Sequence, residues 1–86
     1  MEIFYSPRFA REYKKLPVPV QRQAEKKEVV FRKNPFDRQL KTHKLSGPLD
    51  GFYSFSINFS YRIIFDFKNE KVVRFYNVGK HDVYDS

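Results

Sequence analysis

The sequence has no cysteine and no tryptophan, and only 3 of its 86 residues are glycine. Without cysteine, disulfides, thiolate nucleophiles and zinc–thiolate sites are excluded. No stretch approaches the roughly 20 consecutive apolar residues that a membrane helix needs. The first residues lack the charge pattern of a signal peptide, so we expect a cytoplasmic protein with no membrane association. The chain is too short for two domains with a cofactor between them, and residues 1–86 are predicted to form a single domain.

Aromatic side chains and positive charge are both abundant. The chain contains 10 Phe and 6 Tyr. Large rings bury much apolar area per residue, which allows a short chain without cross-links to fold. Lys and Arg number 17 against 10 Asp and Glu, so the formal net charge is +7. This charge predicts an anionic partner, which can be nucleic acid, a ribosome or an acidic protein.

The first half of the chain is predicted to be helical after a short opening strand at residues 2–5. Ser6 and Pro7 favour a helix start, because the serine hydroxyl caps free N–H groups and proline suits the first helical position. Pro17 ends this helix, and a second helix is predicted over residues 20–33. The short link between them predicts an αα-hairpin. The apolar stripes of the two helices contain Phe9, Tyr13 and Leu16 in the first, and Val20, Ala24, Val30 and Phe31 in the second.

From residue 52 onward the pattern changes to the alternation that is typical of strands. Turns at residues 58–60 and 68–70 divide this part into three strands of an antiparallel meander. We expect the N-terminal strand to join them and both helices to cover one face, which gives an α+β fold in the order β-α-α-β-β-β. The register places Ser56 opposite Arg62 on the outer face, with Tyr76 nearby. The inward residues are predicted to be Tyr53, Phe55, Ile57, Tyr61, Ile63, Phe65, Phe67, Val73 and Phe75.

Positive charge concentrates before the sheet. Residues 1–51 hold 12 basic and 6 acidic groups, whereas residues 52–86 hold 5 and 4. The densest segment, residues 32–45, contains five basic side chains and a single acidic one, Asp37. Such a segment suits phosphate contacts, although a solvated helix end and loop explain it equally well.

His43 and His81 are the only histidines, and both follow or precede predicted strands. Histidine can exchange protons near neutral pH, which suits acid–base catalysis. An ordinary surface role is the more frequent one for a single loop histidine. Two histidines without cysteine or a carboxylate at ligand spacing predict no metal site.

Arg62 interrupts an otherwise apolar strand and is predicted to face away from the core. Its guanidinium can form a salt bridge with Asp66, or it can be held in place to bind a phosphate through two parallel hydrogen bonds. Tyr84 lies three residues after His81. It can pack against the domain, or it can stack on a base beside the histidine.

Five short motifs, in this order, resemble the RelE/ParE superfamily of toxins from type II toxin–antitoxin modules. They are FAREYKKL at 9–16, NPF at 34–36, HKLSGPLDG at 43–51, YRIIF at 61–65 and VGKHDVY at 78–84. The resemblance covers essentially the whole chain. It is greatest to the RelE, YoeB and YafQ branch of mRNA interferases.

This resemblance implies a twisted antiparallel sheet with two N-terminal helices on one face. It implies an endoribonuclease that enters the ribosomal A site and cuts mRNA there. In that reaction the 2′-hydroxyl of the RNA attacks the neighbouring phosphate, and no metal or other cofactor is needed. The implied partners are the ribosome with its mRNA and a cognate antitoxin, which wraps the toxin in a hetero-oligomer.

The resemblance also assigns roles to individual residues. Arg62 matches the strand arginine that contacts the scissile phosphate, and His81 matches the general acid or base. Tyr84 would orient the substrate or stack on a base, and His43 matches the loop histidine of YafQ-like members. Ser56 and Ser60 stand where YafQ-like proteins have a histidine and an aspartate, and the lysine pair of RelE is not reproduced, so the general base stays open. The residues expected to bind RNA through their charge are Arg38, Lys41, Lys44 and Lys80.

Two alternatives use the same fold. A ParE-like member inhibits DNA gyrase without cutting RNA, and a degenerate member only binds its antitoxin and DNA. The set of Arg62, His81 and Tyr84 favours the interferase, because a pure binding module does not need an acid–base group beside an arginine.

Overall fold

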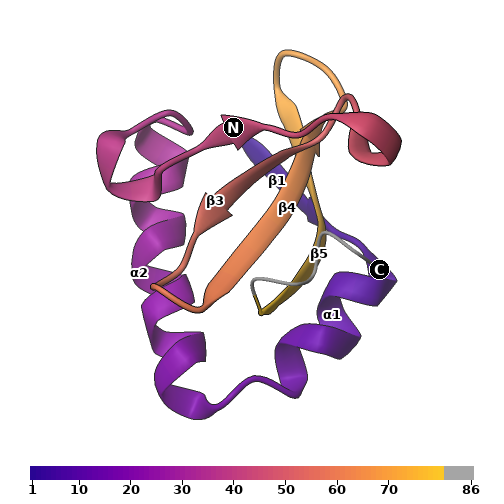
Figure 1. Ribbon diagram of the computed structural model, residues 1–86. Coiled ribbons are helices and arrows are strands. Elements are labelled where there is room, and N and C mark those ends of the chain that lie inside the picture. The colour runs from indigo at the N-terminus through magenta and orange to yellow at the C-terminus, as the bar shows by residue number, and fades with distance from the viewer. Residues whose placement is uncertain (81–86) are drawn as a thin grey trace.

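The computed structural model describes residues 1–80, which form two helices and a five-stranded sheet (Figure 1). The α+β fold predicted from the sequence is confirmed. The one strand that was not predicted, β2, lies between two short 3₁₀ turns. In chain order the elements are β1 (Glu2–Tyr5), α1 (Pro7–Lys14), α2 (Val18–Lys33), η1 (Arg38–Leu40), β2 (His43–Lys44), η2 (Gly47–Leu49), β3 (Tyr53–Ser56), β4 (Tyr61–Phe67) and β5 (Val72–Lys80).

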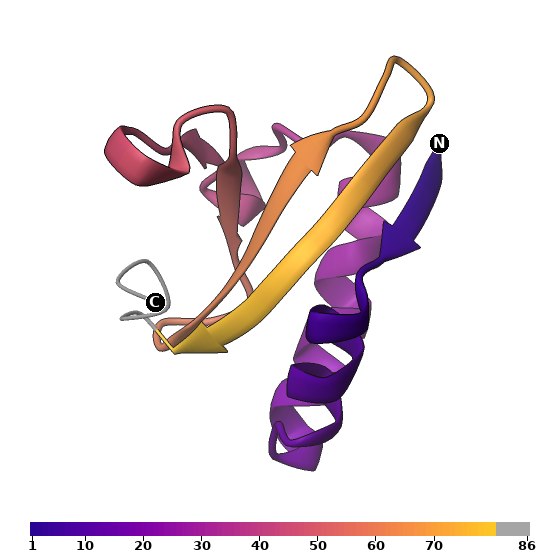
Figure 2. The same cartoon turned by 90° about the vertical axis from the view of Figure 1, so that its right-hand side faces the viewer.

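The strands are arranged in the order β1-β5-β4-β3-β2. The predicted meander is β3-β4-β5, all antiparallel, and β2 adds a further antiparallel pair to its β3 edge. The N-terminal strand joins the sheet as predicted, but it runs parallel to β5, so the sheet is mixed and not wholly antiparallel as the resemblance implied. Both helices lie on one side of the sheet, and η2 lies on the other (Figure 2). We call the side away from the helices the outer face.

The two helices differ from the prediction at the link between them. Ser6 caps α1 as predicted, because its Oγ accepts a hydrogen bond from the Phe9 N–H at 2.9 Å. The helix ends at Lys14, but Leu16 is still buried. α2 begins at Val18, two residues earlier than predicted, because Pro17 takes the N-cap position with an extended ψ of 143°.

The core is a cluster of phenylalanine rings between α2 and the sheet. The Phe31 ring centroid lies 5.0 Å from that of Phe55, 4.9 Å from Phe65 and 5.2 Å from Phe75. All four residues are at most 1% exposed. The predicted inward face is therefore confirmed at its centre, whereas Phe67 at the end of β4 is 39% exposed.

The edge of β5 is closed first by β1 and then by α1. β1 pairs with β5 as far as Phe75, and the Ser6 N–H donates to the Phe75 carbonyl oxygen at 3.0 Å. Further along, the Ser6 hydroxyl donates to the Tyr76 carbonyl oxygen at 2.6 Å, and the Val78 N–H donates to Glu12 Oε1 at 3.0 Å. The backbone of β5 is thus held on this edge by β1, Ser6 and Glu12.

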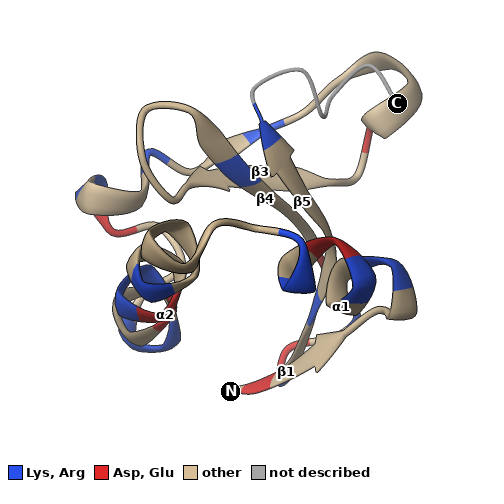
Figure 3. Cartoon of the chain, turned by 90° about the horizontal axis from the view of Figure 1, so that it is seen from below, with Lys and Arg blue, Asp and Glu red and all other residues tan. Residues whose placement is uncertain are grey.

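Lys and Arg residues are distributed along both helices, interspersed with a few acidic residues (Figure 3). The positive charge of the first half of the chain therefore lies largely on the helix side. Within residues 1–80, no helix has both the length and the apolar character that crossing a membrane requires.

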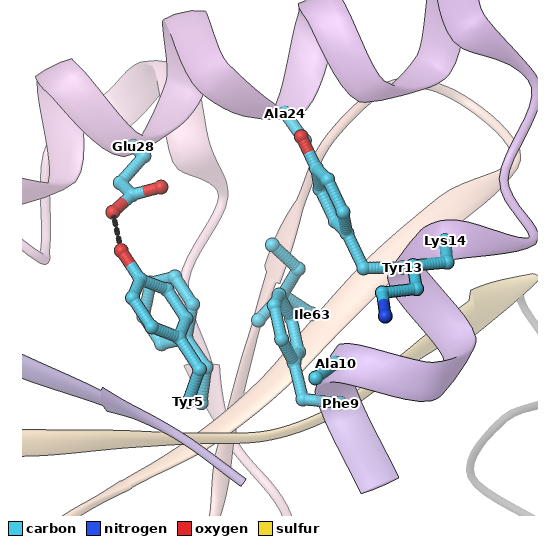
Figure 4. A pocket seen from close by; sticks show the side chains of 9 residues that line it. Tyr5, Phe9, Ala10, Tyr13, Lys14, Ala24, Glu28 and Ile63 are labelled. Atoms are coloured by element: carbon cyan, nitrogen blue, oxygen red, sulfur yellow. Dashed lines mark hydrogen bonds between the residues drawn. The ribbon is translucent and has the colours of Figure 1, made fainter. Parts of the chain in front are cut away.

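Tyr5 joins β1 to α2 at the rim of a pocket of about 370 Å³ on the helix side (Figure 4). Its hydroxyl donates to the Glu28 carboxylate, and Arg32 Nη2 lies 3.4 Å from the same hydroxyl. Burial raises the pKa of Tyr5, and the hydrogen bond and negative charge of Glu28 raise it further.

These interactions predict an alkaline destabilisation that depends on Tyr5. The pKa of Tyr5 is higher in the folded state than in the unfolded state, where it is near 10. The stabilisation is therefore fully present below the pKa of the unfolded state, and it is lost as the pH rises through the pKa of the folded state. We expect the free energy of unfolding, measured by urea titration between about pH 9 and 11, to fall less steeply in Tyr5→Phe than in the wild type. Equal slopes in the two proteins would contradict this role of Tyr5.

Candidate active site

The outer face is formed by side chains that alternate with the core residues of the sheet. Because Ile63 and Phe65 point into the core, Arg62, Ile64 and Asp66 point outward. Pairing between strands arranges the outward positions in three rows. They are Ser56–Arg62–Gly79, His43–Ser54–Ile64–Asn77 and Asp66–Arg74.

Arg62 is held at the β3–β4 turn by one of its two terminal nitrogens. Nη1 lies 2.7 Å from the Asn58 carbonyl oxygen and 3.1 Å from Ser56 Oγ, and the carbonyl oxygens of Phe59 and Tyr61 are 3.4 and 3.1 Å away. Among residues 1–80, no group bonds to Nε or Nη2 and no carboxylate pairs with Arg62. The guanidinium is therefore fixed at one end and presents its other edge, which is the geometry that binds two oxygens of a phosphate.

One interpretation of the sequence paired Arg62 with Asp66, and the structure contradicts it. Arg74 Nε and Nη2 each donate to one Asp66 carboxylate oxygen at 2.9 Å. Register explains this choice, because Asp66 lies directly opposite Arg74 on β5. The bidentate pair neutralises Asp66 and leaves Arg62 as a cation without a counter-charge among the described residues.

His43 lies on the same face as Arg62. It belongs to β2 and pairs with Ser54, and it is exposed, with Nδ1 3.2 Å from the Lys41 carbonyl oxygen. Two strand spacings and two residues of rise separate His43 from Arg62, which corresponds to about 12 Å between their Cα atoms. His43 was predicted to lie in a loop, but it belongs to the two-residue strand β2, whose pairing with β3 directs the side chain to this face.

The four basic residues predicted to bind RNA are all exposed, but they do not form one cluster. Lys41 has left-handed backbone geometry (φ 53°) just before β2, and Arg38 opens η1. Lys44 pairs with Tyr53, and Lys80 pairs with Tyr61. Both tyrosines pack against the core, so these two lysines lie at positions on the helix side of the sheet.

His81 and Tyr84 lie outside the described residues, and their assigned roles stay predictions. In the described part of the chain, no three histidine or carboxylate side chains come together in a group that could hold a metal ion.

The middle of the outer face is buried. Ser54 and Ile64 are 0% exposed and Asn77 is 2% exposed. The side-chain oxygen of Asn77 is buried and accepts no hydrogen bond from any residue in the range 1–80. An unpaired acceptor of this kind is costly unless a ligand or water donates to it. Asn77 was not singled out from the sequence, because an asparagine in a strand carries no signal of its own.

The pocket behind the sheet is separate from this face. It lies between α1, α2 and β4, and its lining is mainly apolar, with Phe9, Tyr13, Ala24 and Ile63 among its residues (Figure 4). Lys14 and Glu28 are the charged side chains among those that line it. Its mainly apolar lining can accept apolar side chains of a partner.

No protein-family model and no curated protein sequence matches the chain. Among solved structures, YafQ from E. coli superposes over 99% of this chain and 98% of its own, with a TM-score of 0.81 and 18% identity. A YoeB/ParE toxin from Agrobacterium tumefaciens superposes over 94% of this chain and 99% of its own, with a TM-score of 0.80 and 14% identity. The chain has the fold of these toxins.

A chain of a toxin–antitoxin complex also has this fold. In the heterotetrameric YoeB–YefM complex from Staphylococcus aureus, the matching chain superposes over 94% of this chain and 97% of its own length, with a TM-score of 0.76 and 20% identity. At these identities the likeness is one of fold. The fold that the RelE/ParE resemblance implied is therefore confirmed, with the outer face opposite the two helices.

Proposed function

We propose that this chain is the toxin of a type II toxin–antitoxin module and that it cleaves mRNA on the ribosome. The observation that carries the proposal is the open edge of Arg62 on the outer face of a YafQ- and YoeB-like fold. The net charge of +7, most of it on the helix side, would favour approach to RNA in general, and Arg62 would supply the phosphate contact on the outer face. Because the proposed target is the translating ribosome, we expect the protein to act in the cytoplasm.

In the proposed reaction, Nε and Nη2 of Arg62 bind the oxygens of the scissile phosphate. The 2′-hydroxyl oxygen of the preceding nucleotide attacks phosphorus as its proton passes to a base. The bond between phosphorus and the 5′-oxygen breaks, and an acid protonates that oxygen. The products are a 2′,3′-cyclic phosphate and a 5′-hydroxyl. Charge accumulates on the phosphate oxygens in the transition state, where a fixed guanidinium stabilises it most.

His43 and His81 are the proposed proton carriers, because histidine can both accept and donate near neutral pH. His43 is on the face of Arg62, and His81 follows Lys80 at the end of β5. We assign Tyr84 to orienting the substrate. Arg38, Lys41, Lys44 and Lys80 would contribute non-specific contacts to phosphates of ribosomal RNA and mRNA.

The proposed partner outside the ribosome is a cognate antitoxin. YoeB and YafQ both occur in complexes, with YefM and DinJ respectively. An antitoxin segment that wraps this chain could bury apolar side chains in the pocket between α1 and α2 while its acidic groups meet the basic helices.

The test is cleavage of a defined mRNA on purified translating ribosomes, followed by primer extension. We expect wild-type protein to cut the mRNA within the A-site codon, to leave a 5′-hydroxyl, and to leave naked mRNA largely intact. A substrate with a 2′-deoxy nucleotide at the attacking position should resist cleavage. Intact mRNA together with accumulation of gyrase–DNA breaks would overturn the proposal in favour of a ParE-like inhibitor.

A further inference from the structure

Two aromatic rings form a shelf on the outer face, which we call the Phe52–Tyr76 shelf. The ring centroids are 5.1 Å apart and the planes are inclined by 44°. Both residues are partly exposed, unlike the fully buried rings of the core. They belong to no part of the core cluster, so the core does not explain why two large rings are placed here.

Arginines lie against the shelf in fixed positions. Arg74 Cζ is 5.2 Å from the Tyr76 ring centroid and 5.9 Å from that of Phe52. Its bidentate pair with Asp66 holds the guanidinium there. Arg8 Cζ is 5.7 Å from the Tyr76 ring. Both guanidinium groups are paired with carboxylates, Arg74 with Asp66 and Arg8 with Glu12, so they hold the rings in place through cation–π contacts without adding net positive charge.

The backbone beneath the rings is also fixed. The Tyr76 carbonyl oxygen accepts a hydrogen bond from the Ser6 hydroxyl. The Phe52 N–H donates to the Leu49 carbonyl oxygen at 3.0 Å, and the Phe52 carbonyl oxygen accepts from the Leu45 N–H at 2.9 Å. When a base stacks on such a surface, the binding free energy is reduced little by loss of conformational entropy in the protein, because the backbone is already ordered.

The shelf lies close enough to Arg62 for one short stretch of RNA to contact both. Arg62 pairs with Gly79, and Tyr76 precedes Gly79 by three residues on the same strand, which is about 10 Å. The register shift at Ile64 and Phe65 leaves Tyr76 without a partner on β4, and this bulge allows both Tyr76 and Asn77 to lie on the outer face. This length corresponds to roughly one or two nucleotides of an extended strand. A phosphate on Arg62 and a base on Tyr76 can thus belong to the same short stretch of RNA.

We infer that the Phe52–Tyr76 shelf is a base-stacking subsite for a nucleotide near the scissile phosphate. The inference rests on the proposed function, which supplies the RNA. The ligand class is a single unpaired nucleobase, which the shelf holds by its face. The shelf therefore fixes the position of the strand along β5 and tolerates different bases.

The probe is ribosome-bound mRNA with 2′-O-methyl nucleotides, which block cleavage, and with 2-aminopurine at each A-site position in turn. Wild-type protein should quench the fluorescence at one position through stacking. Tyr76→Leu should abolish this quenching and bind about tenfold more weakly, whereas Tyr76→Phe should behave as the wild type. Phe52→Leu is a second variant that tests the shelf without touching β5.

An abasic nucleotide at the quenched position provides the control. It should remove the difference in affinity between the wild type and Tyr76→Leu. Melting temperature and antitoxin affinity should be close to wild type in both leucine variants. Suppose that the wild-type protein cleaves ribosomal mRNA, and that Tyr76→Leu and Phe52→Leu keep the wild-type RNA affinity and quenching or lose only antitoxin affinity. The subsite is then refuted and the proposed function stands. If the wild type neither binds nor cleaves ribosomal mRNA, both are refuted.

Discussion

Replacing Arg62 with lysine should lower the rate of mRNA cleavage by about 10²- to 10³-fold. Lysine keeps the positive charge but cannot hold two phosphate oxygens with one rigid group. It also cannot be anchored by Nη1 at the β3–β4 turn while a second edge stays open, as Arg62 is. The measurement is single-turnover cleavage on ribosomes with saturating toxin, so that the chemical step and not binding is observed.

Arg22→Lys is the matched control for this experiment. Arg22 is exposed on α2, a helix that lies on the other side of the sheet from the outer face (Figure 2). The same change of side chain there should leave the rate unaltered. Melting temperature and ribosome affinity should be similar for the two variants and the wild type. An Arg62→Lys protein that cleaves at the wild-type rate would mean that Arg62 does not bind the scissile phosphate.

The position of Arg62 was predictable from the sequence, and its partners were not. Alternation in β4 is enough to direct Arg62 away from the core. Which carboxylate it meets depends on register, and the structure pairs Asp66 with Arg74. His43 shows a second limit, because a strand of two residues is too short to produce a periodic pattern. The shelf combines a ring from the residue before β3 with one from β5, far apart in the sequence, so no local pattern predicts it.

The fold was predictable where periodicity is strong. The alternation of β3 to β5 identifies core residues such as Phe55, and the weaker stripe of α2, interrupted by Lys27, still identifies Phe31. The parallel pairing of β1 with β5 was not specified, since a four-residue strand shows no preference of direction. The sequence also gives no indication that Ile64, on the outer face, is completely buried.

Phe31→Ala should reduce the free energy of unfolding by about 3–5 kcal/mol. Its ring is fully buried and lies within 5.2 Å, centroid to centroid, of the rings of Phe55, Phe65 and Phe75. Removing it loses the transfer free energy of the ring and leaves a cavity that four fixed elements cannot close. Since small domains have a total stability of about 5–15 kcal/mol, this one change should remove a large fraction of it.

Val29→Ala is the control for Phe31→Ala, because Val29 lies two residues earlier on α2 and is 57% exposed. It should change the free energy of unfolding by no more than about 0.5 kcal/mol. Urea titration followed by circular dichroism and by tyrosine fluorescence should show a lower midpoint for Phe31→Ala at an unchanged slope, which indicates lost stability and not a changed unfolded state. Equal midpoints for the two variants would show that the phenylalanine cluster does not hold α2 on the sheet. The outer face, whose strands are fixed from behind by this cluster, would then need another source of rigidity to keep Arg62 in place.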